Sequence, residues 1–257
     1  MSCGCASGVV NRVDLFPESG GDGPKLILLH GFTQTLRSWD TIAADLRKDF
    51  RVCTIDAPGH GRADQVHVDL PTAALLYAAT LGRGTYIGYS MGARLALHIA
   101  LEQPFVVERL VLLGGTAGLA SDQARAVRRV TDDALADTIE HDGVGAFLDH
   151  WLAQPMFANV PNDRADRLQN TALGLATSLR LAGTGAQDNL WDRLGELTMP
   201  VLVMAGEHDA KFTDIGHRMV AHIGDNATFA MVPNAGHAAH LEQPSAFLAV
   251  VRRWLGR

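Results

Sequence analysis

Short apolar runs that stop at glycine, aspartate or histidine recur along this chain. Successive positions within each run are apolar and do not alternate with polar ones, which is typical of strands buried on both faces of a parallel sheet. The pattern predicts strands at Lys25–His30, Arg51–Asp56, Gly84–Gly88, Leu110–Leu113, Val201–Ala205 and, from a weaker pattern, Thr228–Val232.

Helical patterns separate these runs. Apolar residues recur at helical spacing in Ser38–Lys48, Met91–Glu102 and Ser245–Leu255. Because strands alternate with helices, we expect a mostly parallel sheet with right-handed crossovers and helices on its faces.

This alternation stops between Thr116 and Leu197, where we find no convincing strand. The stretch instead contains four helical patterns, at Asp122–His141, Gly143–Trp151, Asp163–Leu181 and Gln187–Leu194. The sequence therefore predicts an α/β fold in which a helical cap, residues 116–197, interrupts one sheet domain made of residues 1–115 and 198–257.

Composition narrows the classes of function. A hydrophobic content of 47% and a charged content of 19% are ordinary for a globular protein. The formal net charge of −6 argues against a nucleic-acid partner, which usually leaves a basic footprint. No apolar run approaches the length of a bilayer span, and the first residues lack the pattern of a secretory signal.

The three cysteines, Cys3, Cys5 and Cys53, are too few and odd in number for a disulfide framework. Cys3 and Cys5 have no further ligands nearby at a spacing that suits a metal. Cys53 lies in an apolar run, where buried packing is the simpler interpretation. We expect a reducing, cytoplasmic location.

The segment Gly88–Gly92 reads Gly-Tyr-Ser-Met-Gly and fits the G-x-S-x-G pattern of a nucleophile elbow. The pattern alone is common by chance, and a glycine-rich turn with an incidental serine would also fit. Its context is more specific, because a predicted strand runs into it and a predicted helix runs out of it. Such a turn would expose Ser90 above the sheet at a helix N-terminus, which favours negative charge.

A reactive serine needs a histidine, and the histidine needs a carboxylate to fix its tautomer. In this type of fold they follow in the order serine, acid, histidine. Asp209 comes after the Val201–Ala205 strand, and His237 lies in a turn after the Thr228–Val232 strand. We therefore predict a Ser90–Asp209–His237 triad at the carboxyl ends of the strands.

Other residues compete for these roles. Among the eleven histidines, His240 and His208 are the main rivals to His237. Asp214 and Asp225 are the alternative acids, although neither directly follows a buried strand.

Two backbone amides are candidates for an oxyanion hole. The residue after the nucleophile supplies one N–H, and the loop after an earlier strand supplies the other. These positions are Met91 and Phe32, the latter in the His30-Gly31-Phe32 loop.

The whole chain resembles the α/β-hydrolase superfamily. Within it, the chain is most similar to the 2-succinyl-6-hydroxy-2,4-cyclohexadiene-1-carboxylate synthases of menaquinone biosynthesis. The segments that carry this resemblance are HGFTQ (30–34), GYSMGAR (88–94), WLAQPMFA (151–158), LATSLRLAGTGAQDNLW (175–191), GEHDAKF (206–212) and AGHAAHLEQP (235–244).

The resemblance implies a lyase on a hydrolase fold. Such an enzyme eliminates pyruvate from 2-succinyl-5-enolpyruvyl-6-hydroxy-3-cyclohexene-1-carboxylate, with Ser90, activated by His237, abstracting a ring proton. A serine–histidine pair can act as a base or as a nucleophile, depending on what lies beside it. The resemblance implies no metal and no organic cofactor.

The substrate would be a small polycarboxylate, which arginine binds well through its planar, bidentate fork. By similarity, Arg94, Arg128 and Arg167 are expected to bind it. Arg129 or Arg125 could take the place of Arg128, and a solvated helix face is the alternative for any cap arginine. Tyr89, Trp151 and Lys211 match the remaining site positions of the family.

Two other functions fit the same sequence. A serine hydrolase that cleaves esters or carbon–carbon bonds would use the same triad and oxyanion hole, but its pocket should be mostly apolar. A non-catalytic binding protein on this fold is the second alternative, since fold does not determine function. A pure binder would not need the complete triad.

Overall fold

The computed structural model describes residues 15–257, so Cys3, Cys5 and the expected absence of a leader lie outside the described residues. One seven-stranded sheet has the order β1-β3-β2-β4-β5-β6-β7. Its strands are β1 (Glu18–Gly20), β2 (Lys25–Leu29), β3 (Arg51–Ile55), β4 (Gly84–Tyr89), β5 (Val107–Leu113), β6 (Val201–Gly206) and β7 (Ala227–Val232). All neighbouring strands are parallel except β1, which is antiparallel to β3.

Six of these strands lie where the apolar runs predict them, which confirms the α/β class. The exception is β1, whose residues Glu-Ser-Gly contain no apolar run. This short edge strand depends on its pairing with β3 and not on a hydrophobic pattern of its own.

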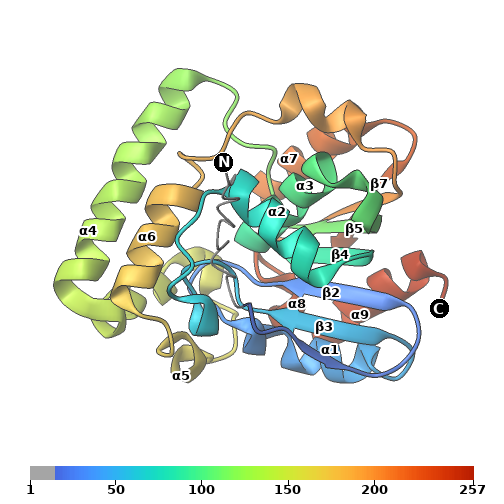
Figure 1. Ribbon diagram of the computed structural model, residues 1–257, viewed down its shortest axis with the longest axis horizontal. Helices are drawn as coiled ribbons and strands as arrows, with labels where there is room; N and C mark the ends of the chain where they lie inside the picture. Colours follow the sequence, from blue (N-terminus) through green and yellow to red (C-terminus); the bar gives the residue numbers. More distant parts are fainter. Residues whose placement is uncertain (1–14) are drawn as a thin grey trace, which may run out of the picture.

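Helices cover both faces of the sheet (Figure 1). On one face lie α2 (Leu70–Leu81), α3 (Met91–Glu102) and α7 (Ala210–Ile223), and on the other lie α1 (Asp40–Leu46) and α9 (Pro244–Leu255). The strands contribute to the hydrophobic cores on both faces of the sheet, because successive side chains such as those of Ile27 and Leu28 point to opposite faces. The short elements around them are η1 (Leu36–Trp39), η2 (Gly61–Ala63), η3 (Pro104–Val106) and α8 (Ala239–Glu242).

The chain from 114 to 200, which contains the predicted cap, has no strand. It forms α4 (Asp122–Leu152), η4 (Pro155–Phe157), α5 (Arg164–Arg167), α6 (Ala172–Ala182) and η5 (Trp191–Glu196). Helices α4 and α6 lie side by side at one end of the sheet (Figure 1). They enclose a small apolar cluster that includes Ile139, Phe147 and Leu175.

The cap helices differ in detail from the predicted ones. The two patterns at 122–141 and 143–151 form one element with a break at Gly143, whose φ is 81°. The predicted helix 163–181 is two helices, because Thr171 caps the start of α6 by accepting the N–H of Gly174. The predicted helix 187–194 is wrong in its first part, since residues 187–190 are irregular and only the 3₁₀ helix η5 follows.

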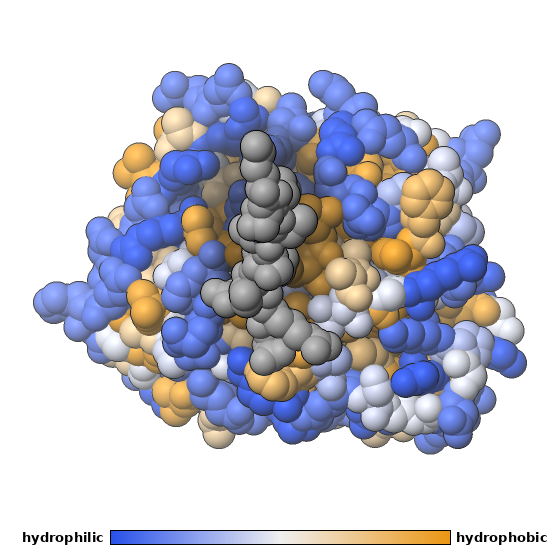
Figure 2. Space-filling model, in the orientation of Figure 1, coloured by the Kyte–Doolittle hydropathy of each residue, from blue (hydrophilic) through white to orange (hydrophobic). Residues whose placement is uncertain are grey.

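Hydrophilic residues cover most of the surface visible in Figure 2, and hydrophobic ones occur there in small groups. Within residues 15–257, no helix combines the length and the apolar character that a membrane crossing requires.

Candidate active site

Ser90 lies in a strained turn between β4 and α3. Its φ of 51° is in the left-handed region, which side-chain-bearing residues rarely adopt. The Ser90 N–H donates to the carbonyl oxygen of Leu113 on the neighbouring strand at 2.8 Å. The turn is therefore anchored to the sheet while the serine hydroxyl stays free to face the cavity.

The flanking glycines allow this turn because no side chain fits there. A Cβ on Gly88 would lie 2.3 Å from the carbonyl oxygen of Gly92. A Cβ on Gly92 would lie 2.2 Å from the carbonyl oxygen of Leu29. Both contacts are with backbone, which cannot move aside without disturbing the sheet.

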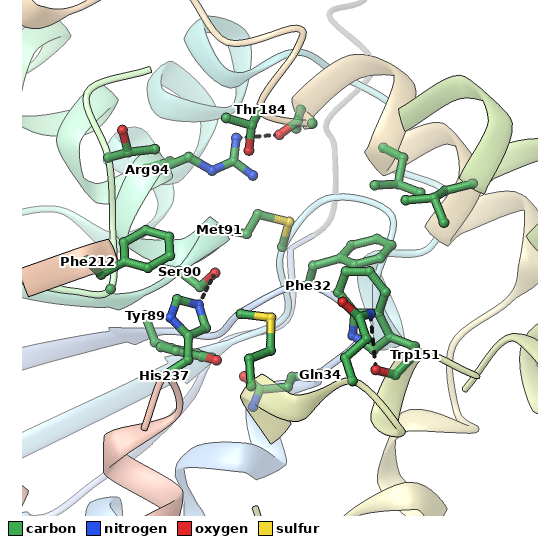
Figure 3. Close-up of a pocket in the computed structure, with 18 of the residues that line it drawn as sticks. Phe32, Gln34, Tyr89, Ser90, Met91, Arg94, Trp151, Thr184, Phe212 and His237 are labelled. Carbon is green, nitrogen blue, oxygen red and sulfur yellow. Dashed lines mark hydrogen bonds between the residues drawn. The ribbon is translucent and has the colours of Figure 1, made fainter. Parts of the chain in front are cut away.

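The structure brings Ser90, His237 and Asp209 together from three separate loops. The Nε2 atom of His237 lies 3.3 Å from the Ser90 hydroxyl, and its Nδ1 atom lies 2.6 Å from Oδ2 of Asp209 (Figure 3). Asp209 also caps α7 by accepting the N–H of Phe212 at 3.3 Å. A carboxylate fixed in this way can hold the imidazole with one nitrogen directed at the serine.

The rival residues lie elsewhere. His240 is on α8 with its ring between those of Trp39 and Tyr89, at centroid distances of 4.3 and 4.5 Å. Burial lowers the pKa of His240 to about 3, so the ring is neutral at pH 7. His208, Asp214 and Asp225 have exposed side chains, and none of them contacts His237 among the described residues.

A cavity of about 410 Å³ opens in front of Ser90. Every predicted site residue lines it except Asp209, which lies behind His237. The predicted residues on its wall are Phe32, Tyr89, Ser90, Met91, Arg94, Arg128, Trp151, Arg167, Lys211 and His237. Figure 3 shows that Arg94 lies toward one end and that Phe32 and Trp151 form the opposite side.

Arg94 points from α3 toward the cap and is buried. It donates to the carbonyl oxygen of Ala182 at 2.6 Å and approaches Oε1 of Gln187 at 3.5 Å. Burial, reinforced by repulsion from Arg128, lowers the pKa of Arg94 to about 10, which leaves the guanidinium charged at neutral pH. A buried charge of this kind is stabilised when an anion pairs with it.

Arg128 is the member of the cap arginine cluster that reaches the cavity, whereas Arg125 and Arg129 do not line it. Its Nε atom donates to Oδ1 of Asp132, one helical turn along α4, at 2.7 Å. Asp132 is buried, and its other oxygen accepts the N–H of Gly185 at 3.0 Å. The carboxylate thus fixes the arginine against the loop that follows α6.

Arg167 and Lys211 complete the cationic lining. Arg167 is fully buried, donates through Nε to Asp163 at 2.7 Å, and also donates to the hydroxyl of Thr33. Lys211 is exposed, with its ammonium 5.3 Å from the ring centre of Phe212. Among the described residues, no carboxylate oxygen lies within 4.0 Å of the charged nitrogen atoms of Lys211 or of Arg94.

Aromatic side chains form the less polar part of the wall. Trp151 packs edge-on against Phe32 at a centroid distance of 5.4 Å and stacks on Phe147 at 5.6 Å. Tyr89 lies 5.3 Å from the ring of His237, and burial raises the pKa of its phenol above the ordinary value. The phenol is therefore neutral and can act only as a hydrogen-bonding group.

Phe32 and Met91, whose peptide N–H groups the sequence predicts as an oxyanion hole, both line the cavity in front of Ser90. Met91 is the first residue of α3, so its N–H has no acceptor within the helix. Their role as an oxyanion hole stays a prediction.

Sequence reasoning did not single out Asp132 or Gln187, which hold the cavity arginines. The spacing of Arg128 and Asp132 is a signal that could have identified the first, because residues four apart face each other on a helix. No local pattern marks Gln187. In residues 15–257 there is also no group of three or more potential metal ligands.

Comparisons with known proteins agree with the α/β fold of this chain. The family described as alpha/beta hydrolase fold matches residues 24–244. A Bacillus subtilis protein named, with a provisional qualifier, 2-succinyl-6-hydroxy-2,4-cyclohexadiene-1-carboxylate synthase is 36% identical over 95% of this chain and 94% of its own. A Salmonella newport protein with that name unqualified is 32% identical, over 86% of this chain and 90% of its own. The solved structure of MenH from S. aureus superposes with a TM-score of 0.88 at 28% identity, covering 93% of this chain and 97% of that one.

Proposed function

This chain belongs to the α/β-hydrolase fold family, and from its site we propose that it is a carbon–oxygen lyase. The reaction is the elimination of pyruvate from 2-succinyl-5-enolpyruvyl-6-hydroxy-3-cyclohexene-1-carboxylate. The product is 2-succinyl-6-hydroxy-2,4-cyclohexadiene-1-carboxylate, which the names of the two synthases above also contain. The resemblance in sequence places this reaction in menaquinone biosynthesis.

The charge of the cavity carries the proposal. Its wall contains Arg94, Arg128, Arg167 and Lys211, and no aspartate or glutamate lines it among the described residues. The chain as a whole has a net charge of −6, so the positive charge is local. The substrate has a carboxylate on the ring, on the succinyl arm and on the enolpyruvyl group, and this lining matches such a polyanion.

The elimination starts at the ring carbon that bears the succinyl group. Its proton is acidic because the neighbouring ketone can take up the negative charge as an enolate. In the proposed step Ser90 removes this proton and passes its own proton to His237. The electrons form the new 2,3 double bond, the 3,4 double bond moves to the 4,5 position, and the carbon–oxygen bond to the enolpyruvyl group breaks. His237 then gives up its proton, which balances the one that the released enolate takes up at carbon to become pyruvate.

The remaining groups support that step. Asp209 holds the His237 imidazole and stabilises its charged form while it carries the proton. The N–H groups of Phe32 and Met91 would donate to the enolate oxygen, and such a donor contributes about 3 kcal/mol to transition-state stabilisation. The aromatic wall of Trp151 and Tyr89 offers the ring an apolar surface. A volume of about 410 Å³ is within the range of small-molecule sites.

The decisive experiment follows pyruvate release from the enolpyruvyl substrate with a coupled dehydrogenase. We expect turnover by the wild-type protein and none by Ser90→Ala. The control is Ser121→Ala, which removes a serine that caps α4 and does not line the cavity. It should change pyruvate release little.

A serine hydrolase is the second candidate, because the same triad geometry supports it. In that reaction Ser90 would attack a carbonyl instead of removing a proton. A simple aryl ester distinguishes the two. Rapid turnover of the ester without any pyruvate release would reject the lyase and favour the hydrolase.

A further inference from the structure

Thr33, next to Phe32, has an unusual backbone. Its φ is 66°, in the left-handed region, and it is one of three non-glycine residues between 15 and 257 with a positive φ. For a β-branched residue this conformation is a genuine outlier, which persists only when the surroundings enforce it.

Each polar atom of Thr33 has a partner. Its N–H donates to Nε2 of His60 at 3.3 Å, and its carbonyl oxygen accepts the Nδ2–H of Asn170 at 2.7 Å. Its hydroxyl accepts a hydrogen bond from Arg167. Thr33 itself is fully buried, so these three contacts replace all contact with water.

His60 is suited to this task because it is buried and neutral. Burial lowers its pKa to about 3, and its Nδ1 atom lies 2.9 Å from the carbonyl oxygen of Pro58. Since Nδ1 must carry the proton to donate there, Nε2 is left as the acceptor for the Thr33 N–H.

The other two partners come from the cap. Asn170 follows α5, is buried, and also donates to the carbonyl oxygen of Arg167 at 2.9 Å. Its Oδ1 accepts the N–H of Gly61 in the sheet domain at 2.9 Å. The Asn170 side chain therefore joins the cap to two loops of the sheet domain. The orientation of its amide is fixed because Oδ1 accepts the N–H of Gly61 while Nδ2 donates to the carbonyl oxygen of Thr33.

We propose that Asn170 is a positioning residue that holds the strained Thr33 backbone, and with it the N–H of Phe32, in place for oxyanion stabilisation. The proposal rests on the function proposed above for Ser90 and Phe32. Asn170 binds the carbonyl oxygen of the Thr33–Gln34 peptide, and the N–H of that same peptide donates to the carbonyl oxygen of Gly31 at 3.2 Å. The Gly31–Phe32 peptide carries the Phe32 N–H, so the direction of that N–H depends on the turn that Asn170 holds. The Phe32 ring is fixed from the same side, by Trp151 of the cap.

The test is Asn170→Asp, which keeps an oxygen for the Gly61 N–H and replaces the donor to Thr33 by a second oxygen. We expect kcat for pyruvate release to fall about 10- to 100-fold, since a small misplacement of a catalytic group has effects of that size. KM should stay within about threefold. Asn162→Asp is the matched control, because Asn162 is exposed on the same segment and its side chain forms a hydrogen bond only with the N–H of Arg164 within residues 15–257. A wild-type kcat for Asn170→Asp, or a loss confined to KM, would overturn the proposal.

Two further variants separate the positioning role of Asn170 from the effect of a new charge and from other effects of the substitution. Asn170→Ser is uncharged and too short to reach the Thr33 carbonyl, so it should show the same loss in kcat. Thr33→Gly adopts a positive φ without cost. In that background the effect of Asn170→Asp should shrink to less than about threefold, and an equal loss in both backgrounds would contradict the positioning role.

An aryl acetate separates this proposal from the proposed function. If the wild-type protein releases no pyruvate, the lyase is refuted, but ester hydrolysis through Ser90 needs the same amide. Slower ester turnover by Asn170→Asp would then still support the positioning role. Wild-type ester turnover by Asn170→Asp would refute it.

Discussion

The guanidinium of Arg94 donates a 2.6 Å hydrogen bond to the carbonyl oxygen of Ala182. The first residue belongs to the helix after Ser90 and the second ends a cap helix, so the contact joins the two parts of the chain across the cavity. This bond uses one of the five N–H donors of the guanidinium. The charge of Arg94 has no carboxylate partner among the described residues. This arrangement suits an arginine whose partner is a substrate carboxylate.

Replacing Arg94 should therefore weaken the lyase reaction strongly. A hydrogen bond to a charged group contributes about 1.5–3 kcal/mol, so Arg94→Ala should lower kcat/KM for pyruvate release about 10- to 150-fold. Arg94→Lys keeps the charge but loses the planar fork, and should recover only part of this loss. Steady-state kinetics with the enolpyruvyl substrate measure both variants.

Arg180→Ala is the control for Arg94. Arg180 lies on α6 but pairs with Asp137 and Glu140 at the surface, away from the cavity. It should retain kcat/KM close to wild type. Equal losses in the Arg94 and Arg180 variants would indicate a general effect on the cap and would contradict a specific carboxylate contact.

Asp209→Asn tests the proposed triad. The amide is the same size as the carboxylate but cannot hold the imidazole in the required tautomer, so kcat should fall about 10³- to 10⁴-fold. Asp214→Asn removes a carboxylate from the exposed side of the same helix and should leave kcat nearly unchanged. If the two variants have similar kcat values, Asp209 is not the acid of a triad.

The sheet was predictable because its signal is local. Buried parallel strands such as β6, and β2 after its first residue Lys25, lack the alternation of apolar and polar positions, and the elbow around Ser90 has a strand before it and a helix after it. The edge strand β1 was not predictable in this way, because its three residues are polar or glycine and their conformation comes from pairing. The irregular stretch 187–190 was predicted as helix. Its conformation is set by tertiary contacts, such as the hydrogen bond that Gln187 donates to the carbonyl oxygen of Thr116.

The same difference between local sequence signals and long-range contacts applies to the residues of the candidate site. Motif order identifies Ser90, Asp209 and His237 because each follows a recognisable strand. The groups that orient the arginines depend in part on contacts between distant segments: Gln187 approaches Arg94 from 93 positions away, and Asp132 accepts the N–H of Gly185 as well as pairing locally with Arg128. The strain at Thr33 likewise depends on Asn170, 137 positions away, and no neighbouring residue predicts it.

Asp132→Ala should destabilise the fold. The substitution leaves the buried Gly185 N–H without its acceptor and removes the partner of Arg128. An orphaned buried donor costs about 1–3 kcal/mol, and the half-exposed Arg128 pair adds little because water screens it. Urea denaturation should show a loss of that size in the free energy of unfolding. Asp133→Ala, at the next position of α4 and without a polar contact among the described residues, should change it by less than about 0.5 kcal/mol.

The buried histidines predict how stability depends on pH. Burial lowers the pKa of His30 and His98 to about 4 and that of His60 and His240 to about 3. Between those values and the unfolded pKa of about 6.5, the unfolded chain binds more protons than the folded one. The free energy of unfolding therefore falls as the pH drops from about 6.5 to about 4, by about 1.4 kcal/mol per pH unit for each histidine involved.

His240→Phe tests the contribution of one of these histidines to the pH dependence of stability. The ring of His240 has no hydrogen-bond partner among the described residues and packs at an angle between the rings of Trp39 and Tyr89, so phenylalanine can take its place. At pH 7 we expect little change in the free energy of unfolding. Between pH 6 and 4.5 the slope of that free energy against pH should decrease by about 1.4 kcal/mol per unit. His67→Phe, at an exposed position, should leave the slope as it is in the wild type. An unchanged slope in His240→Phe would mean that this histidine takes up no additional proton when the chain unfolds.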